Sequence, residues 1–426
     1  MKFIDICSGI GGFRSALEKH GHECMAFAEI DKFAKQSYKA IYDTENEEEL
    51  DDITSVTDEH FRLYRGQVDI ITGGFPCQAF SIAGNRRGFE DTRGTIFFHI
   101  ARAIKEIQPS YVLLENVKGL LSHDKGRTYG TIVQALDELG YFIEWGLFNS
   151  KYWGVPQNRE RVYILVTRKD VWKEPKLFNL VKQQTSVDTR LVDILEKDVD
   201  ESYYLSEEKT RKLTLNEDLS GRLNHYDYRD VDSVHSVNRV SPTLNTMQGG
   251  DRQPKVAVPV LTPDRVNKRQ NGRRFKENNE PMFTLTSQDR HGIAISENVS
   301  QLKRKSFVSK KEFGRMGKQA SETMNENIDL IEEGMTINSY NKTLNSTGVS
   351  PTVTTRPEGF KTAILPVTNN LRIRKLTPLE CWRLQGFSDE QFYKAKNSGV
   401  SNSQLYKQAG NAVTVNVVDA IVGELE

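Results

Sequence analysis

Runs of apolar residues alternate with amphipathic stretches along the first 168 residues of the chain. Amphipathic spacing predicts helices over 13–20, 32–41, 96–107 and 131–139. Five apolar runs end in polar or glycine-containing turns, as buried strands do: KFIDIC, CMAFAEI, VDIITGG, YVLLENV and RVYILVT. Strands that are apolar on both faces and alternate with helices favour a mostly parallel sheet. The pattern therefore predicts a doubly wound α/β domain.

The pattern changes after Arg168, where polar, Asn- and Gly-rich sequence extends to about Asn370. A degenerate unit recurs there, with a Thr-Leu or Thr-Val step, a polar turn and an apolar strand. Its three steps are Thr243-Leu244, Thr284-Leu285 and Thr352-Val353. Short β-hairpins often resemble one another, but matched turns in three copies favour duplication. We assign residues 1–185 and 405–426 to the α/β domain, and 186–404 to a smaller β-rich domain with internal repeats and a hinge.

Charge is distributed unevenly, although 58 basic and 58 acidic residues balance over the whole chain. Residues 1–168 carry 20 basic and 24 acidic side chains, whereas residues 221–318 carry 19 basic and 10 acidic. The basic segment is either an ordinary solvated surface or a phosphate-binding one. No apolar stretch reaches the roughly 18 residues of a membrane span, and the N-terminus lacks an export pattern, so we expect a cytoplasmic location. The four cysteines show no metal-ligand spacing, so no metal is expected.

A glycine-rich turn follows the first predicted strand in DICSGIGGF. Gly9, Gly11 and Gly12 permit a tight turn and the close approach of a ligand. Glu29 ends the next strand, where a carboxylate accepts hydrogen bonds from ribose hydroxyls in nucleotide sites. The spacing differs from the dinucleotide GxGxxG pattern, so an adenosine with a sulfonium tail fits as well as a dinucleotide. A plain strand–turn–helix is the simpler alternative.

Three further motifs place reactive side chains at strand ends. Cys77 follows Pro76 in a loop after VDIITGGF, where α/β folds bind ligands and where a thiolate serves as a nucleophile. The polar, basic sequence IAGNRRGFEDTRG after it has the character of a loop that closes over a substrate. Glu115 ends YVLLENV, and Arg159 and Arg161 alternate toward one face in QNRERVYIL. We interpret the arginines as anion or base-edge contacts beside the thiolate, the alternative being paired surface arginines.

In this order the motifs resemble those of the DNA (cytosine-5)-methyltransferase family. DICSGIGGF is similar to its cofactor loop, FPCQAFS to its nucleophile loop, ENV to its cytosine-holding motif and QNRERVYIL to its paired-arginine motif. RKLTPLECWRLQGF resembles the motif that supports the recognition domain, and QAGNAVTVNVV the C-terminal motif that completes the cofactor site. The resemblance covers residues 1–168 and 372–426. It implies a Rossmann-like fold of the S-adenosylmethionine-dependent type, with residues 186–404 as the target-recognition domain.

The resemblance implies catalysis by Cys77, Glu115, Arg159 and Arg161. Cys77 would add to C6 of a flipped-out cytosine, Glu115 would hold the N3 and amine edge, and Arg161 would contact the O2 side. S-Adenosyl-L-methionine would be the methyl donor. Its implied contacts are Gly9, Gly11, Phe13, Glu29, Ile30, Asp52, Pro76, Asn411 and Ala412. Two departures stand out: Cys-Ser-Gly replaces the usual Phe-Ala-Gly of the cofactor loop, and Ile30 replaces a common aromatic residue, so aliphatic packing would replace adenine stacking.

Double-stranded DNA is the implied partner, with a restriction endonuclease as functional counterpart, and we expect a monomer that binds no membrane. DNA contacts are expected in the loop after the nucleophile and in the repeats: Gln78, Ser81, Arg86, Arg87, Arg93, Gln248, Arg252, Gln288 and Arg290. Three alternatives remain. A tRNA cytosine-5 methyltransferase usually has a shorter recognition region, an inactive relative would not need every catalytic motif, and a nicotinamide-dependent dehydrogenase would need GxGxxG.

Overall fold

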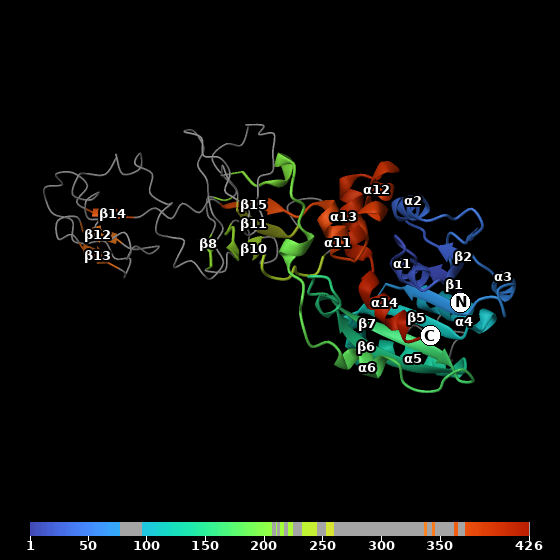
Figure 1. The fold of residues 1–426 in the computed structure, drawn as a ribbon. Helices are drawn as coiled ribbons and strands as arrows, with labels where there is room; N and C mark the ends of the chain where they lie inside the picture. The colour runs from blue at the N-terminus through green and yellow to red at the C-terminus, as the bar shows by residue number, and fades with distance from the viewer. Residues whose placement is uncertain are drawn as a thin grey trace. The chain divides into compact units, whose positions relative to one another are not determined.

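A seven-stranded sheet forms the core of the N-terminal part of the computed structural model (Figure 1). Its strands lie in the order β3-β2-β1-β4-β5-β7-β6, and all pairings are parallel except those of β7 with β5 and β6. The strands are β1 (Lys2–Ile6), β2 (Glu23–Ala28), β3 (Glu48–Glu49), β4 (Ile70–Gly74), β5 (Tyr111–Val117), β6 (Tyr141–Asn149) and β7 (Glu160–Arg168). The predicted doubly wound, mostly parallel sheet is thus confirmed.

The structure describes residues 1–76, 96–206 and 371–425, with shorter pieces between them: 210, 214–216, 220–224, 232–244, 253–259, 336–338, 343–345 and 362–364. The chain divides into one unit of Met1–Val258 with Ile373–Glu426 and a second unit of Pro259–Arg372. No helix in the described residues is long and apolar enough to cross a membrane. No group of three or more His, Cys, Asp or Glu side chains in those residues is arranged to hold a metal ion.

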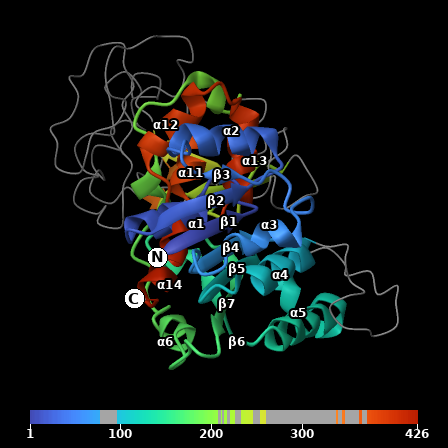
Figure 2. The ribbon, with the colours of Figure 1, turned by 90° about the vertical axis from the view of Figure 1, so that its right-hand side faces the viewer.

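Helices flank the seven-stranded sheet, and Figure 2 shows α1 and α14 on one side of its strands and α3, α4 and α5 on the other. The helices around this sheet are α1 (Gly12–Lys19), α2 (Lys32–Ile41), α3 (Asp58–Arg62), α4 (Ile96–Ile107), α5 (Arg127–Glu138), α6 (Leu177–Lys182) and α14 (Val415–Gly423). The apolar strands supply the core because both faces of the sheet are covered, and Ile71, Leu114 and Ile164 are completely buried.

The strand order creates a switch point between β1 and β4. From β1 the chain winds outward through β2 and β3, and it then returns to β4, which pairs with β1 on the other side. Ile6 and Gly73 are partners at the carboxyl ends of these two strands. The glycine-rich turn after β1 and the Phe75–Pro76 segment after β4 therefore leave the sheet side by side, where doubly wound folds bind their ligands.

Three C-terminal helices return to the N-terminal part of the chain: α11 (Pro378–Arg383), α12 (Asp389–Asn397) and α13 (Asn402–Asn411). Capping boxes begin α11 at Thr377 and α12 at Ser388, because each hydroxyl accepts a backbone N–H and the Glu or Gln three residues later returns the bond. Helix α12 packs against α2. Lys407 of α13 forms a 2.6 Å ion pair with Asp31, the N-cap of α2. These contacts fix the turn that carries Glu29.

Two smaller sheets lie in the region predicted to be β-rich. A five-stranded sheet has the order β15-β11-β10-β9-β8, with a small core that includes Leu223, Val234 and Ile373. Its strands are β8 (Thr214–Leu215), β9 (Gly221–Arg222), β10 (Ser233–Ser236), β11 (Lys255–Pro259) and β15 (Leu371–Lys375). The second unit contains an antiparallel sheet in the order β13-β12-β14. Its strands are β12 (Thr336–Asn338), β13 (Thr343–Asn345) and β14 (Thr362–Ile364). The described residues between 207 and 375 thus include short strands, whereas α11 and α12 also fall within the range 186–404.

Candidate active site

The glycine-rich turn and Glu29 form one side of the site. Gly9 has a φ of +58° and its N–H donates to Oε2 of Glu29 at 2.8 Å. The N–H of Asp31 donates to Oε1 of the same carboxylate at 2.8 Å. Each oxygen keeps a second lone pair for an outside donor. A Cβ built on Gly9 would meet nothing within 4 Å, so the turn is open on the face beside Glu29.

The other two glycines of the turn are packed from behind. A Cβ on Gly11, whose φ is +81°, would lie 2.3 Å from Cε2 of Tyr42. A Cβ on Gly12 would lie 2.6 Å from Cγ2 of Val413. Val413 belongs to the C-terminal GNAV sequence, so this motif closes against the turn. The three glycines thus differ in their surroundings. Gly9 faces open space that a ligand can occupy, whereas the side chains of Tyr42 and Val413 pack against Gly11 and Gly12.

The residues around the turn fit an adenosine-type cofactor. The hydroxyl of Ser8 is buried and has no hydrogen-bond partner among the described residues, so it is available to a bound polar group. Ile30 is 72% exposed beside Glu29 and offers an apolar face. The N–H and side chain of Thr54 lower the pKa of Asp52, which keeps its half-buried carboxylate ionised. The residues around the turn therefore include a carboxylate with spare lone pairs, an exposed apolar side chain and a second ionised carboxylate.

The remaining predicted cofactor residues differ in exposure. Phe13 is 2% exposed and belongs to the core beneath the turn. Pro76 and Asn411 are exposed, whereas Ala412 is buried. Asn411 ends α13, the helix that Lys407 ties to the Glu29–Asp31 turn. The cofactor assignment of these residues stays a prediction.

Glu115 and Arg161 meet at the carboxyl end of β5. Oε1 of Glu115 lies 3.0 Å from Nε of Arg161. The antiparallel register of β5 and β7 pairs Val117 with Arg161, which brings the two side chains together. Glu115 is only 9% exposed, and burial raises its pKa, opposed by the charges of Arg161 and Arg159. Such a carboxyl group takes up a proton more readily than an exposed glutamate does.

The segment that leads to the predicted nucleophile is fixed beside Glu115. Nδ2 of Asn116 donates to the carbonyl oxygen of Phe75 at 2.7 Å. Oε2 of Glu115 lies 3.7 Å from the position of a Cβ on Gly74, so a side chain there would touch the carboxylate. Cys77 is two residues beyond Phe75 and lies outside the described residues. The described residues that precede it, Gly74 and Phe75, therefore lie beside Glu115 and Asn116.

Arg159 is completely enclosed behind this pair at 2% exposure. Its Nη atoms donate to main-chain carbonyls of Leu244 at 3.3 Å, Gly410 at 3.2 Å and Ala412 at 2.8 Å. Burial and the nearby Arg161 charge lower its pKa to about 10, so it remains cationic at neutral pH. Arg159 thus connects β7 with the C-terminal motif and with the first Thr-Leu step.

Gln157 was not among the predicted site residues, but it anchors the first repeated step. Its Oε1 accepts the N–H of Leu244 at 3.2 Å, and its Nε2 donates to the carbonyl of Leu384 at 2.8 Å. The hydroxyl of Thr243 donates to the carbonyl of Asn158 at 2.7 Å. The position of Gln157 in QNRER was the only sequence signal. Thr243-Leu244 is therefore held beside the strand that carries Arg161.

Several predicted residues lie outside the described part of the chain. These are the nucleophile, the loop and repeat residues proposed to contact DNA, and the second and third repeated steps: Cys77, Gln78, Ser81, Arg86, Arg87, Arg93, Gln248, Arg252, Gln288, Arg290, Thr284-Leu285 and Thr352-Val353. Their roles stay predictions.

Comparison with known proteins connects this geometry to a family. The family model for C-5 cytosine-specific DNA methylases matches residues 1–294 and 286–426. The chain belongs to this family. It is a DNA (cytosine-5)-methyltransferase, and methyltransferases of this type generally use S-adenosylmethionine. The orphan methyltransferase M.SPRI of Bacillus phage SPR is 34% identical, with 100% of this chain and 97% of that protein covered. The type II methyltransferase M.BanI of Aneurinibacillus aneurinilyticus is 32% identical, covering 100% and 95%.

Solved structures share the fold of this methyltransferase at low sequence identity. The S. pombe Dnmt2 methyltransferase matches with a TM-score of 0.57 and 15% identity, with 100% of this chain and 97% of that chain covered. A Spodoptera frugiperda DNMT2 mutant matches with a TM-score of 0.55 and 19% identity, covering 100% and 99%. These likenesses support the α/β fold and say nothing of substrate.

Asp5 lies on β1, the strand that precedes the glycine-rich turn, and it should make the stability of the protein depend on pH. Its side chain is fully buried on β1 and accepts a 2.8 Å hydrogen bond from Thr72, and burial raises its pKa from 3.8 to about 7. The folded protein binds this proton more tightly than the unfolded chain does. The protonated Asp5 therefore adds to the free energy of unfolding at acidic pH, and this stabilisation is lost as pH rises toward 7.

Asp5→Asn removes this ionisation. We expect the variant to gain stability relative to the parent between pH 4.5 and 7, by up to about 1.4 kcal/mol per pH unit, and the difference to level off above pH 7. Urea unfolding of both proteins at several pH values measures this, and any fixed effect of the asparagine cancels in the comparison. A stability difference that does not change with pH would contradict the expectation.

Proposed function

We propose that this methyltransferase transfers a methyl group from S-adenosyl-L-methionine to C5 of a flipped-out cytosine in a short sequence of double-stranded DNA. The observation that carries the proposal is the buried Glu115–Arg161 pair, 3.0 Å apart, beside the strand exit that leads to Cys77. A thiol, a protonatable carboxyl and a cation at one strand edge match what activation of a cytosine ring requires.

In the proposed reaction, four side chains of the protein have distinct roles. The Cys77 thiolate adds to C6 of the cytosine, and electron density moves to N3 and C5. Glu115 holds the N3 and amine edge and supplies a proton as that charge develops. Arg161 faces the O2 side and keeps Glu115 in place, while Arg159 holds β7 against the C-terminal motif. Bound S-adenosylmethionine would supply the electrophilic methyl group for C5. Solvent water then takes the C5 proton, the electrons of the C5–H bond expel the Cys77 thiolate, and the proton at N3 returns to Glu115, which restores the aromatic ring.

Cofactor binding is proposed at the turn after β1. Glu29 would accept the ribose hydroxyls, Asp52 the adenine amine, and Ile30 would cover the adenine. Gly9, Gly11, Phe13, Pro76, Asn411 and Ala412 would complete the site. The open face of Gly9 and the spare lone pairs of Glu29 support this placement.

Target recognition is proposed for residues 186–404, and catalysis for 1–185 with 405–426. The anchoring of Thr243-Leu244 against Gln157 and Arg159 supports a recognition segment next to the strand that carries Arg161. Gln78, Ser81, Arg86, Arg87 and Arg93 are proposed to contact DNA near the flipped base, and Gln248, Arg252, Gln288 and Arg290 to read base edges. We further propose a monomer whose methylation protects DNA from a nuclease of the same specificity.

A methylation assay with two substrates tests the function. The purified protein is incubated with labelled S-adenosylmethionine and either unmethylated DNA or bulk tRNA, and modified cytosines are mapped by conversion sequencing. Reactions without protein set the background. Methylation at a short DNA motif is expected, and DNA so modified should resist a nuclease that cuts there. Label on tRNA alone would assign the enzyme to RNA, and cofactor binding without transfer to either substrate would overturn the catalytic proposal.

A further inference from the structure

Tyr42 lies directly behind the glycine-rich turn. It follows the last residue of α2, is 8% exposed, and donates its hydroxyl proton to the carbonyl oxygen of Gly11 at 2.7 Å. Its ring occupies the space where a side chain on Gly11 would lie, with Cε2 only 2.3 Å from that Cβ position. The ring and its hydroxyl therefore both contact the Gly11 segment of the turn. The open face of Gly9 lies only two residues away.

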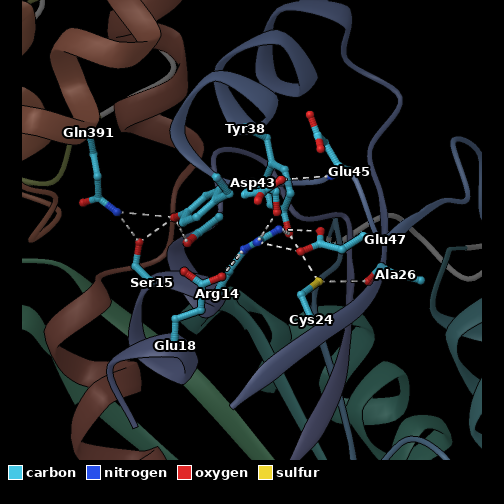
Figure 3. A network of polar contacts seen from close by, with 12 residues as sticks. Arg14, Ser15, Glu18, Cys24, Ala26, Tyr38, Asp43, Glu45, Glu47 and Gln391 are labelled. Carbon is cyan, nitrogen blue, oxygen red and sulfur yellow. Dashed lines mark hydrogen bonds and ion pairs between the residues drawn. The ribbon is translucent and has the colours of Figure 1, made fainter. Parts of the chain in front are cut away.

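The Tyr42 hydroxyl also ends a directed chain of hydrogen bonds. Its single proton goes to Gly11, so the Ser15 hydroxyl, 2.6 Å away, must donate to Tyr42. The Nε2 of Gln391 in turn donates to Ser15 at 2.8 Å, as Figure 3 shows. Oε1 of Gln391 accepts the N–H of Ser388 in the capping box of α12. The glycine-rich turn is thereby connected to helix α12 by successive hydrogen bonds, each donated in the direction from Gln391 toward Gly11.

A buried cation fixes the tyrosine ring from another side. Cζ of Arg14 lies 4.4 Å from the centroid of the Tyr42 ring, within range of a cation–π contact. Arg14 is held by a two-pronged ion pair with Glu47, at 2.6 and 2.7 Å, and by Glu18 at 2.7 Å (Figure 3). Because the guanidinium has little freedom, the ring it touches has little freedom as well. Tyr42 is thus held by Arg14 while it supports Gly11.

We propose that Tyr42 is a positioning residue for the S-adenosylmethionine site, which it supports through Gly11 without touching the cofactor. The inference rests on the proposed cofactor function of the turn. Its consequence is specific: loss of the Tyr42 hydroxyl weakens cofactor binding and leaves the chemical step intact, because Glu115, Arg161 and the exit of β4 make no contact with this network among the described residues.

The variant Tyr42→Phe keeps the ring and removes only the hydroxyl. We expect its Kd and KM for S-adenosylmethionine to rise about fivefold, the effect of one buried hydrogen bond, with kcat unchanged within about twofold. Calorimetry with the full chain gives Kd, and initial rates on DNA give the split between KM and kcat. Gln391→Glu, which turns the first donor of the chain into an acceptor, should raise KM in the same direction and add little to Tyr42→Phe.

Tyr38→Phe is the matched control. Tyr38 is completely buried and its hydroxyl accepts from Arg14 at 3.3 Å, but it makes no hydrogen bond to the turn among the described residues. It should leave KM for the cofactor unchanged. An unchanged KM in Tyr42→Phe, or an equal rise in Tyr38→Phe, overturns the inference while the proposed function stands. A parent protein that binds no S-adenosylmethionine overturns the proposed function, and the inference with it.

Discussion

Replacement of Cys77 by alanine is expected to abolish methylation of DNA while the affinity for S-adenosylmethionine stays within about twofold. C5 of cytosine is a poor nucleophile until a nucleophile adds at C6, and of the proposed catalytic groups only Cys77 can form that bond. The glycine-rich turn proposed to bind the cofactor follows β1, whereas Cys77 follows β4, so removal of the thiol should leave the turn and its hydrogen bonds in place. Transfer of labelled methyl groups and calorimetry measure the two quantities.

A covalent trap makes this prediction more specific. With 5-fluorocytosine at the mapped target, methyl transfer leaves fluorine where the departing proton should be, so Cys77 cannot be expelled. A protein–DNA adduct that survives denaturing electrophoresis is expected for the parent and not for Cys77→Ala. Cys24→Ala is the matched control, because Cys24 is also a free thiol but lies partly buried beside Tyr38. Burial raises the pKa of the Cys24 thiol, which disfavours the thiolate. An adduct from Cys77→Ala, or its loss in Cys24→Ala, would contradict the assignment.

The strands that could be predicted from sequence are those buried on both faces. β1, β4, β5 and β7 read as continuous apolar runs because helices cover the sheet on both sides. β6 was not predicted; it lies at the edge of the sheet, with Phe142 at 42% and Trp145 at 48% exposure. Its sequence YFIEWGLFN is largely apolar, but Glu144 and Gly146 interrupt the kind of continuous run that marks the buried strands.

Within the site, residues marked by the local sequence could be predicted, whereas contacts between distant positions could not. Gly9, Glu29, Glu115 and the two arginines could be named because each occupies a fixed place at the end of a strand. The support of Gly11 by Tyr42 and the anchoring of Leu244 by Gln157 could not be predicted from the sequence. Those contacts join positions 31 and 87 residues apart and rest largely on main-chain atoms, which leave no signature in the sequence. Arg159 is an example: its hydrogen bonds go to backbone carbonyls, so the identity of the acceptor residues gives no sequence signal for its partners.

Replacement of Glu115 by glutamine is expected to lower kcat by about 10²- to 10⁴-fold, the usual contribution of a general acid. Glutamine keeps the size of the side chain and its place beside Arg161, but it has no carboxyl proton to supply. Burial raises the pKa of Glu115, so the parent retains its proton to higher pH than an exposed glutamate, and its kcat should fall as pH rises through that pKa. The variant should lack this limb of the pH–rate profile.

Glu144→Gln separates this chemistry from the general effect of removing a buried carboxylate. Glu144 lies on β6, accepts the N–H of Lys176 at 2.7 Å, and has a pKa that is likewise raised by burial, but it belongs to no strand end of the site. Its replacement should leave kcat and the pH–rate profile unchanged. Thermal unfolding of both variants detects any loss of folding, which matters for Glu115→Gln because Arg161 then keeps an unbalanced charge. A folded Glu115→Gln protein with kcat within tenfold of the parent would show that the carboxyl proton is not required.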